Sequence, residues 1–150
     1  MLPNMSPDVS LREVEESDLP VFFEHQADPA AYTLADFPPR DREAFFAHWA
    51  GRRELPNTWQ RTIVADGQVV GNVQSFVRDG VQEVGYWLGR QYWGRGYASA
   101  ALAQFLPLVP VRPLYANLAK SNVGSRRVLE KAGFEIIRDA DGDLFMRLDA

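Results

Sequence analysis

The sequence predicts an α+β fold in which helices pack on a mixed β-sheet. Alternating polar and apolar segments indicate strands; some strands are separated only by two-residue turns, and others by segments of helical length. Hairpins give antiparallel neighbours and helical crossovers give parallel ones, so one sheet contains both kinds. With 150 residues, the chain is long enough for a single domain, residues 1–150, and too short for two.

The N-terminal part is expected to form a strand, a helix and a loop. Residues 9–14, "VSLREV", alternate and predict a strand. Residues 17–27 predict a helix, with Ser17 as its N-cap and Pro20 tolerated in the first turn. Residues 28–41 contain three prolines, which predicts a loop or a broken helix.

A second helix and three consecutive strands are expected next. Residues 42–53 predict a short amphipathic helix that buries aromatic side chains. Its inward side chains are Phe45, Phe46 and Trp49. The strands at 59–65 and 68–77 flank Asp66–Gly67, a strong signal for a two-residue hairpin turn. The tripeptide "RDG" then turns the chain into a third strand at 81–88.

The C-terminal part is expected to hold two helices and three strands. In chain order they are a helix from about Tyr97 that ends at Pro107 and Pro110, a strand at 113–118, a helix at 121–133, and a hairpin of strands at 134–138 and 143–148. Proline disfavours helical backbone at the residue before it, which sets the end of the first helix. Gly133 is placed as the left-handed terminator of the second helix.

The composition indicates an ordinary globular protein, with 46% hydrophobic and 24% charged residues. A net charge of −4 argues against a nucleic-acid partner. The sequence lacks cysteine, so it offers no disulfide, thiol nucleophile or thiolate metal site. The most apolar stretch, residues 101–111, is too short for a membrane span of about 20 residues, and no signal peptide is visible. We therefore expect a cytoplasmic protein with no membrane partner.

The stretch "QYWGRGYASAAL" (91–102) indicates a binding site for an anion. Gly94 and Gly96 permit a close approach of the backbone, and the turn leads into a helix whose N–H groups favour negative charge. A turn without a ligand is the alternative. A Walker A loop is excluded by the missing Lys–Ser/Thr pair, and a dinucleotide fingerprint fails at Ser99, where its third glycine belongs. No residues have metal-ligand spacing, so no metal is expected.

The segments "EVGYWLGRQYWGRGYASAAL" and "NVGSRRVLEKAGF" together resemble the GNAT N-acetyltransferase family, in its ribosomal-protein N-terminal acetyltransferase-like (RimJ/RimL-type) branch. The residues that match the family's acetyl-CoA signature are Gln91, Gly94 and Gly96. Those that match its second signature are Asn122, Ser125, Lys131, Gly133 and Phe134. The resemblance covers essentially the whole chain. It implies the GNAT fold, a mostly antiparallel mixed sheet of about six or seven strands with helices on both faces.

The resemblance also implies a reaction, the transfer of an acetyl group from acetyl-CoA to a primary amine. The amine, on a protein N-terminus or a small molecule, attacks directly in a ternary complex. The backbone amides expected to hold the pyrophosphate are those of Gly94, Arg95, Gly96, Tyr97 and Ala98. The pantetheine arm would pair with the strand at 82–88, where a backbone N–H near Leu88 polarises the thioester carbonyl. Trp87 is expected in the pocket wall.

Glu83 is the candidate catalytic base that the resemblance suggests. The attacking amine must be neutral, and a lysine with a pKa of about 10.4 needs a base far more than an α-amine at about 7.7–8.0. Family members often place a glutamate on this strand, where it acts through a water. An exposed strand carboxylate without a catalytic role is the alternative.

Ser125 is the candidate acid that protonates the leaving CoA thiolate. Many family members use a tyrosine seven residues after the asparagine at 122, but Leu129 stands there. Ser125 lies on the apolar stripe of its helix and could replace the phenol, or could bond only to its own helix backbone.

Two further residues of this helix are candidates for cofactor contacts. Asn122 would bind the pantetheine amide or cap the helix, and Ser121 competes for the cap. Arg127 would reach the CoA phosphates, although Arg126 or Arg127 belongs to a solvated face.

The sequence also departs from the family pattern. Ala100 stands where members of this branch usually have a glutamate, and Pro107 and Pro110 shorten the helix after the glycine turn. These departures keep open a rival class, a non-catalytic CoA-binding sensor or interaction domain of the same fold. An unliganded structural domain is a further rival.

The acceptor pocket is expected between the loop at 28–41, the turn at 78–81 and the C-terminal hairpin. The candidate acceptor contacts are Tyr32, Asp36 and Phe37. Asp36 would attract a cationic amine or would simply be a turn residue. His25 and His48 are interpreted as helix-surface or packing residues. Proteins of this fold often pair, so a homodimer is also an expectation, although no interface pattern is legible.

Overall fold

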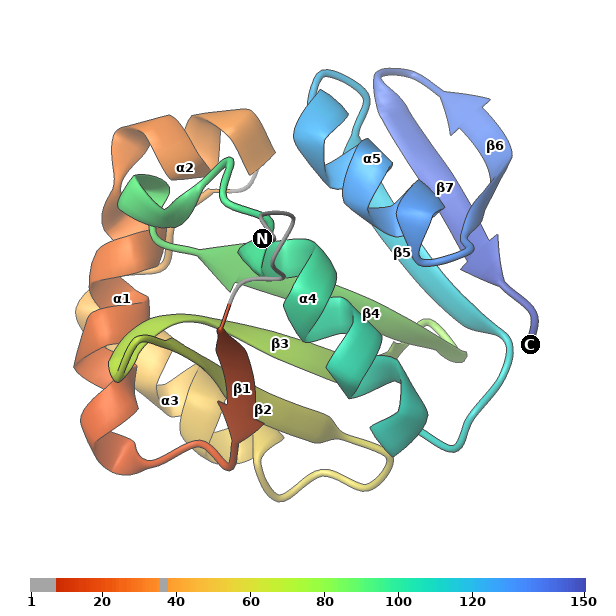
Figure 1. Ribbon diagram of the computed structural model, residues 1–150. Coiled ribbons are helices and arrows are strands. Elements are labelled where there is room, and N and C mark those ends of the chain that lie inside the picture. The colour runs from red at the N-terminus through yellow and green to blue at the C-terminus, as the bar shows by residue number, and fades with distance from the viewer. Residues whose placement is uncertain (1–7, 36–37) are drawn as a thin grey trace, which may run out of the picture.

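The structure, a computed structural model, describes residues 8–35 and 38–150. It contains one seven-stranded sheet in the order β1-β2-β3-β4-β5-β7-β6 (Figure 1). The strands are β1 Val9–Arg12, β2 Trp59–Ala65, β3 Gln68–Arg78, β4 Val81–Leu88, β5 Leu114–Ala119, β6 Glu135–Ala140 and β7 Asp143–Leu148. The helices are α1 Leu19–Ala27, α2 Pro29–Ala35, α3 Arg42–Arg52, α4 Tyr97–Phe105 and α5 Val123–Lys131, with 3-10 turns η1 Glu16–Asp18, η2 Arg90–Tyr92 and η3 Leu106–Leu108. The predicted α+β fold with a mixed, mostly antiparallel sheet is confirmed.

Helices cover both faces of the sheet. In Figure 1, α4 crosses the front of the sheet, and α1 and α3 lie against the opposite face. The larger core lies between the sheet and α4, and includes Ile63, Leu102 and Phe105. A second cluster packs α1 against α3, where Phe45 and Trp49 are buried as predicted. Phe46 is only half-buried at the margin of that cluster.

Three hairpins close with Asp-Gly turns whose two central residues both have positive φ. The φ angles are 51° and 75° at Asp66–Gly67, 52° and 79° at Asp79–Gly80, and 49° and 87° at Asp141–Gly142. Two consecutive left-handed residues match the right-handed twist of the flanking strands, and Asp and Gly tolerate this backbone best. The predicted hairpins at these turns are confirmed.

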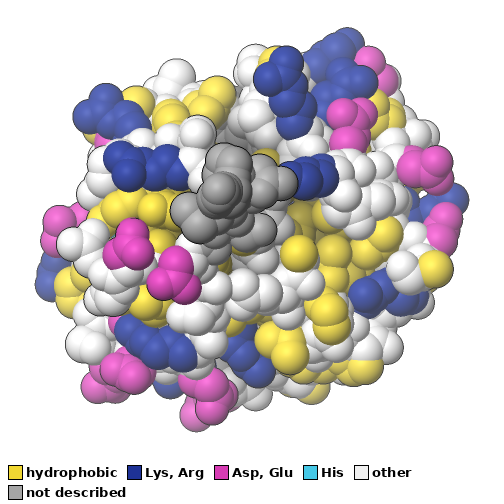
Figure 2. Space-filling view, viewed as in Figure 1, with side chains coloured by type: hydrophobic (Ala, Val, Ile, Leu, Met, Phe, Trp, Pro, Cys, Tyr) yellow, Lys and Arg dark blue, Asp and Glu magenta, His cyan; other side chains and the backbone are white. Residues whose placement is uncertain are grey.

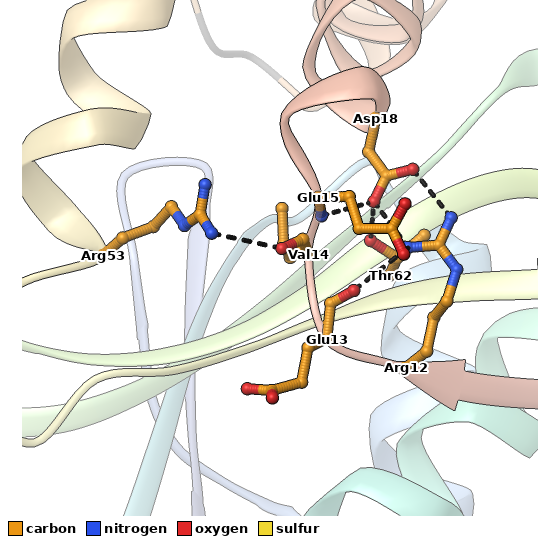
Figure 3. Close-up of polar contacts among 7 residues, drawn as sticks. All are labelled: Arg12, Glu13, Val14, Glu15, Asp18, Arg53 and Thr62. Atoms are coloured by element: carbon orange, nitrogen blue, oxygen red, sulfur yellow. Dashed lines mark hydrogen bonds and ion pairs between the residues drawn. The ribbon is translucent and has the colours of Figure 1, made fainter.

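The start of the first helix differs from the prediction. Ser17 is not an N-cap, because it lies inside the turn η1 that precedes α1. The buried carboxylate of Asp18 organises this region (Figure 3). It accepts hydrogen bonds from both terminal nitrogens of Arg12 at 2.8 Å, from Glu15 N at 2.8 Å and from Thr62 Oγ1 at 2.7 Å. These contacts tie β1, η1 and β2 together.

The segment 28–41, predicted as a loop or a broken helix, contains the helix α2. Pro29 is its first residue, a position where the missing N–H costs nothing. Asp28 Oδ1 accepts from Ala30 N at 3.0 Å and supports the first turn. The other two prolines follow the helix, so the proline content marks its ends rather than a break.

Strands β4 and β5 separate along their length, and this opens the sheet. Within the described residues they are the one parallel pair of strands. They pair at a single position, where Glu83 lies opposite Tyr115. By contrast, β3 and β4 pair over eight positions. Figure 1 shows β5 diverging from β4 toward α5. The edge of β4 from Val84 to Leu88 therefore faces a gap rather than a neighbouring strand.

Candidate functional site

A cavity of about 510 Å³ occupies the gap beside β4. Its walls come from the C-terminal half of β4, the glycine turn, the start of α5 and one side of α2. The lining residues used below are Ala31, Leu34, Ala35, Tyr86, Trp87, Leu88, Gly94, Gly96, Tyr97, Ala98, Asn122 and Ser125. This volume and mixed lining are typical of small-molecule and cofactor sites.

The glycine turn presents the start of α4 to this cavity. Gly94 and Gly96 have φ of 74° and 81°, in the left-handed region that favours glycine. Gly96 is the N-cap of α4, and no side chain caps the helix. The first N–H groups of the helix therefore have no intrahelical acceptor. A Cβ added at Gly94 would meet no atom within 4 Å, so the turn is open to a ligand.

Tyr86 and Ser125 meet across the cavity, from β4 and α5. Their hydroxyl oxygens are 2.9 Å apart. Ser125 Oγ thus has a partner outside its own helix, and Asn122 caps that helix, since its Oδ1 accepts from Ser125 N at 3.1 Å. Burial raises the pKa of Tyr86, and the hydrogen bond with Ser125 offsets only part of that increase. Leu129, where many family members have a tyrosine, is buried in the core, and the phenol that reaches Ser125 belongs to Tyr86.

Most of the predicted cofactor residues line this cavity, but three do not. Those on the cavity wall are Trp87, Leu88, Gly94, Gly96, Tyr97, Ala98, Asn122 and Ser125. Arg95 and Arg127 are exposed outside it. Gln91 borders a smaller hollow with His25 and Asp28. Cofactor contacts of these three residues stay predictions.

The helix α5, whose start lines the cavity, carries basic side chains on its exposed surface. Figure 2 shows Lys and Arg at the upper right of this face, where Figure 1 places α5. That helix carries Arg126, Arg127 and Lys131, and Arg126 pairs with Glu130 at 3.2 Å. Positive charge in this position suits the phosphates of a nucleotide-bearing cofactor.

Glu83 is buried, which excludes the exposed strand carboxylate considered above. It is 6% exposed, and it binds Arg78 through both oxygens, with Oε1 2.8 Å from Nη2 and Oε2 3.1 Å from Nε. The Asn117 amide lies 3.5 Å from Oε2. Glu83 faces away from Tyr86, because neighbouring strand residues of opposite parity point to opposite faces. It does not line the cavity.

One face of β4 carries the residues that alternate with Val84 and Tyr86. Glu83, Gly85 and Trp87 share this face, and four residues of strand span about 13 Å. A Cβ added at Gly85 would meet no atom within 4 Å, so the space above it is open. Trp87 belongs to the cavity wall. We call the stretch from Trp87 over Gly85 to Glu83 the acceptor groove.

The predicted acceptor residues are placed only in part. Tyr32 is half-buried on α2 and does not line the cavity, and Asp36 and Phe37 lie outside the described residues. The α2 residues on the cavity wall are Ala31, Leu34 and Ala35. Their i, i+3, i+4 spacing is the sequence signal that could have identified them.

Several other predicted features are located by the structure. Ala100 packs against the larger core, so an apolar contact stands where the branch usually has a carboxylate. The helix α4 ends at Phe105 and continues as the turn that contains Pro107, as predicted. His25 is buried with its ring 6.4 Å from that of Tyr92, in agreement with a packing role.

Two negative findings hold for residues 8–35 and 38–150. No helix in these ranges combines the length and apolar character that a membrane span requires. No three His, Cys, Asp or Glu side chains gather there in a way that could bind a metal ion.

An uncapped helix start, an open strand edge and a hydroxyl pair line one cavity, an arrangement that fits the class of CoA-dependent acyltransferases. The sequence profile described as "Acetyltransferase (GNAT) domain" matches residues 8–135, and the chain belongs to this family. Its members use acetyl-CoA as co-substrate. A search of curated proteins gives no match.

Solved structures of acetyltransferases share the fold at low identity. The Agrobacterium tumefaciens acetyltransferase is 20% identical, with a TM-score of 0.78 over 100% of this chain and 96% of that one. Mycobacterium smegmatis RimJ, solved with CoA-disulfide, is 22% identical, with a TM-score of 0.73 over 95% and 82%. Vibrio cholerae spermidine N-acetyltransferase, solved with CoA and spermine, is 12% identical, with a TM-score of 0.77 over 93% of each chain.

Proposed function

We propose that this protein is an N-acetyltransferase that moves the acetyl group of acetyl-CoA to a primary amine by direct attack in a ternary complex. One observation carries the proposal: a single cavity joins the open glycine turn, the unpaired edge of β4 and the Tyr86–Ser125 pair. These features suit, in order, the pyrophosphate, the pantetheine arm and the thiol sulfur of one extended ligand.

The donor is held chiefly by the backbone. The free N–H groups from Gly94 to Ala98 bind the pyrophosphate, because a helix start concentrates donors and positive potential there. The pantetheine amides pair with the edge of β4 that β5 leaves open. A backbone N–H near Leu88 polarises the thioester carbonyl and stabilises the oxyanion that forms during attack.

The acceptor amine approaches over Gly85. Its nitrogen attacks the carbonyl carbon, the C–N bond forms, and collapse of the tetrahedral intermediate breaks the C–S bond and leaves the electron pair on sulfur. The amine proton goes to a water that Glu83 positions. The thiolate receives the proton of Ser125 Oγ, which Tyr86 replaces through the 2.9 Å contact, and bulk water restores Tyr86.

Thiol release in the presence of a panel of primary amines tests this function. The proposal expects acetyl-CoA to bind and free thiol to appear in proportion to acetylated amine. Binding of acetyl-CoA without thiol release from any amine would instead support the non-catalytic CoA-binding sensor. Tyr86 weakens the case for that rival, because it supplies the hydroxyl that seemed to be missing.

The assignment to a branch of the GNAT family rests on the two sequence motifs at 91–96 and 122–134. We place the chain in the RimJ/RimL-type branch, which agrees with the presence of Mycobacterium smegmatis RimJ and the Brucella melitensis ribosomal-protein-alanine N-acetyltransferase, at 22% and 19% identity, among the similar structures.

A sequence without cysteine suits the reducing cytoplasm, where we locate the protein. A homodimer stays a prediction.

A further inference from the structure

The far end of the acceptor groove carries a third charged side chain beside the Arg78–Glu83 pair. Arg52, at the end of α3, places its guanidinium carbon 4.1 Å from the centroid of the Phe76 ring. Phe76 is the direct cross-strand neighbour of Glu83, and such neighbours have Cβ atoms about 5 Å apart on one face. The guanidinium of Arg52 thus covers the same face of the sheet as Glu83.

The charges in this cluster do not balance. Both oxygens of Glu83 are already bound to Arg78, and no described carboxylate pairs with Arg52. Arg52 Nε is buried and has no hydrogen-bond partner among the described residues. Burial lowers the pKa of Arg52, and so do the nearby charges of Arg40 and Arg78, while the charge of Glu83 raises it and offsets only part of that decrease.

The neighbouring histidine does not change this balance at neutral pH. Burial, together with Arg40 and Arg52, lowers the pKa of His48 to about 4, so its ring is uncharged. The groove end therefore holds more positive than negative charge in a partly desolvated setting. Such charge is unfavourable until an anion with matching hydrogen-bond acceptors arrives.

We propose that the acceptor is an amine that carries an anionic group, a carboxylate or a phosphate, which Arg52 binds at the end of the acceptor groove. This inference rests on the proposed function. Gly85 and Glu83 are two strand residues apart, about 7 Å, so an amine above Gly85 and an anion beside Glu83 belong to one molecule with a few bonds between them. The guanidinium fork of Arg52 suits carboxylate and phosphate oxygens.

A matched set of acceptors tests the proposal with the wild-type protein. The probes are 4-aminobutyrate, its neutral amide 4-aminobutyramide, 3-aminopropylphosphonate and the dication 1,4-diaminobutane, each assayed by thiol release. We expect kcat/KM for at least one anionic probe to exceed that for the neutral amide by about tenfold to a hundredfold, as for a charge-assisted hydrogen bond. The ratio between carboxylate and phosphonate identifies which anion the site accepts.

Two substitutions on α3 assign the effect to the groove. Arg52→Gln should lower kcat/KM for the anionic probe about tenfold or more beyond any change for the neutral amide, and so remove the preference, whereas Arg52→Lys should keep part of the preference. Arg42→Gln is the matched control. It removes the same charge from the same helix, and Arg42 also covers a phenylalanine ring, at 5.0 Å from Phe46, but in a different part of the molecule.

The possible outcomes separate the inference from the function on which it rests. Equal rates for anionic and neutral probes, or the fastest rate with the dication, would overturn the inference and leave the acetyltransferase intact. An equal loss of preference in Arg42→Gln would also overturn it, since a general charge effect would then suffice. Acetyl-CoA binding without thiol release from any probe would overturn both.

Discussion

The donor cavity and the acceptor groove share strand β4, but they are built from different parts of the chain. The cavity offers backbone groups, namely the start of α4 and an open strand edge. The groove offers charged side chains, with Glu83 and Arg78 in a buried pair and Arg52 beside them. The difference fits the proposed division of roles, in which main-chain geometry holds a constant cofactor and side chains on the opposite face select the acceptor.

The largest expected effect comes from the hydroxyl pair in the donor cavity. Tyr86→Phe should lower kcat by about a hundredfold, the lower range for general acid catalysis, and leave the Kd of acetyl-CoA within a few-fold. Steady-state kinetics and calorimetry measure the two quantities.

A double-mutant cycle with Ser125→Ala sharpens this prediction. If Tyr86 and Ser125 act as one relay, the double variant loses little more than either single variant. Losses that multiply would show that the two hydroxyls act separately, and an unchanged kcat in Tyr86→Phe would remove this residue from the mechanism.

The next effect concerns the glycine turn. Gly94→Ala should weaken acetyl-CoA binding by about tenfold to a hundredfold, because a Cβ there lies between the ligand and amides that make charge-assisted hydrogen bonds. Calorimetric titration gives the Kd.

Gly80→Ala provides a control with nearly the same backbone strain. Gly94 and Gly80 have φ of 74° and 79°, and neither would place a Cβ within 4 Å of another atom. Both variants should lose about 1–2 kcal/mol of stability, and only Gly94→Ala should lose affinity. Equal affinity in the two variants would refute the role of the turn.

A substitution in the acceptor groove should impair the reaction with the amine and leave acetyl-CoA binding unchanged. Gly85→Val fills the open space on β4 with a residue that favours strands, and the φ of Gly85 is not positive. We expect kcat/KM for the amine to fall about tenfold, as when a well-placed contact is lost, while the Kd of acetyl-CoA stays within twofold. A matching loss of acetyl-CoA affinity would mean that the donor occupies the groove.

The smallest effect on the reaction is expected from the Asp18 cluster, which lies outside both sites. Burial alone would raise the pKa of Asp18, but hydrogen bonds from Arg12, Glu15 and Thr62 outweigh it and lower the pKa below the ordinary value. Asp18 therefore stabilises the fold above its unfolded-state pKa of about 3.9, and this contribution is lost as the pH falls through the lower folded-state value.

Asp18→Asn should cost about 1–3 kcal/mol of unfolding free energy at pH 7 and weaken the acid dependence of stability. Urea denaturation at pH 7 and near pH 3 measures both. The Kd of acetyl-CoA should not change; a changed Kd would show that β1 supports the cavity.

The sequence allowed good predictions where the physics is local. The Asp-Gly turns and the glycine turn before α4 depend on backbone preferences of two or three adjacent residues, so each could be recognised by inspection. The three prolines at 28–41 predict a loop or a broken helix and do not locate α2, because Pro29 occupies the one helical position that favours proline instead of breaking the helix.

The parts that could not be predicted depend on contacts between distant segments. Tyr86 and Ser125 are 39 residues apart in the chain, and no local pattern brings their hydroxyls together. Arg52 comes from α3 and lies over the Phe76 ring of β3, a contact between segments 24 residues apart in the chain that no local pattern predicts. The Arg78–Glu83 ion pair lies between these two cases. Arg78 is five residues from Glu83 across a predicted hairpin, so the pairing could be inferred from the register of that hairpin.

The most direct test is an amide chemical-shift titration of the protein with acetyl-CoA. The account predicts that saturation moves the backbone N–H resonances of residues 94–98 and of β4 from Val84 to Leu88, and moves those of α3 much less. Saturation that leaves residues 94–98 unmoved, or shifts that gather on α3 instead, would contradict the placement of the cofactor in the cavity beside β4.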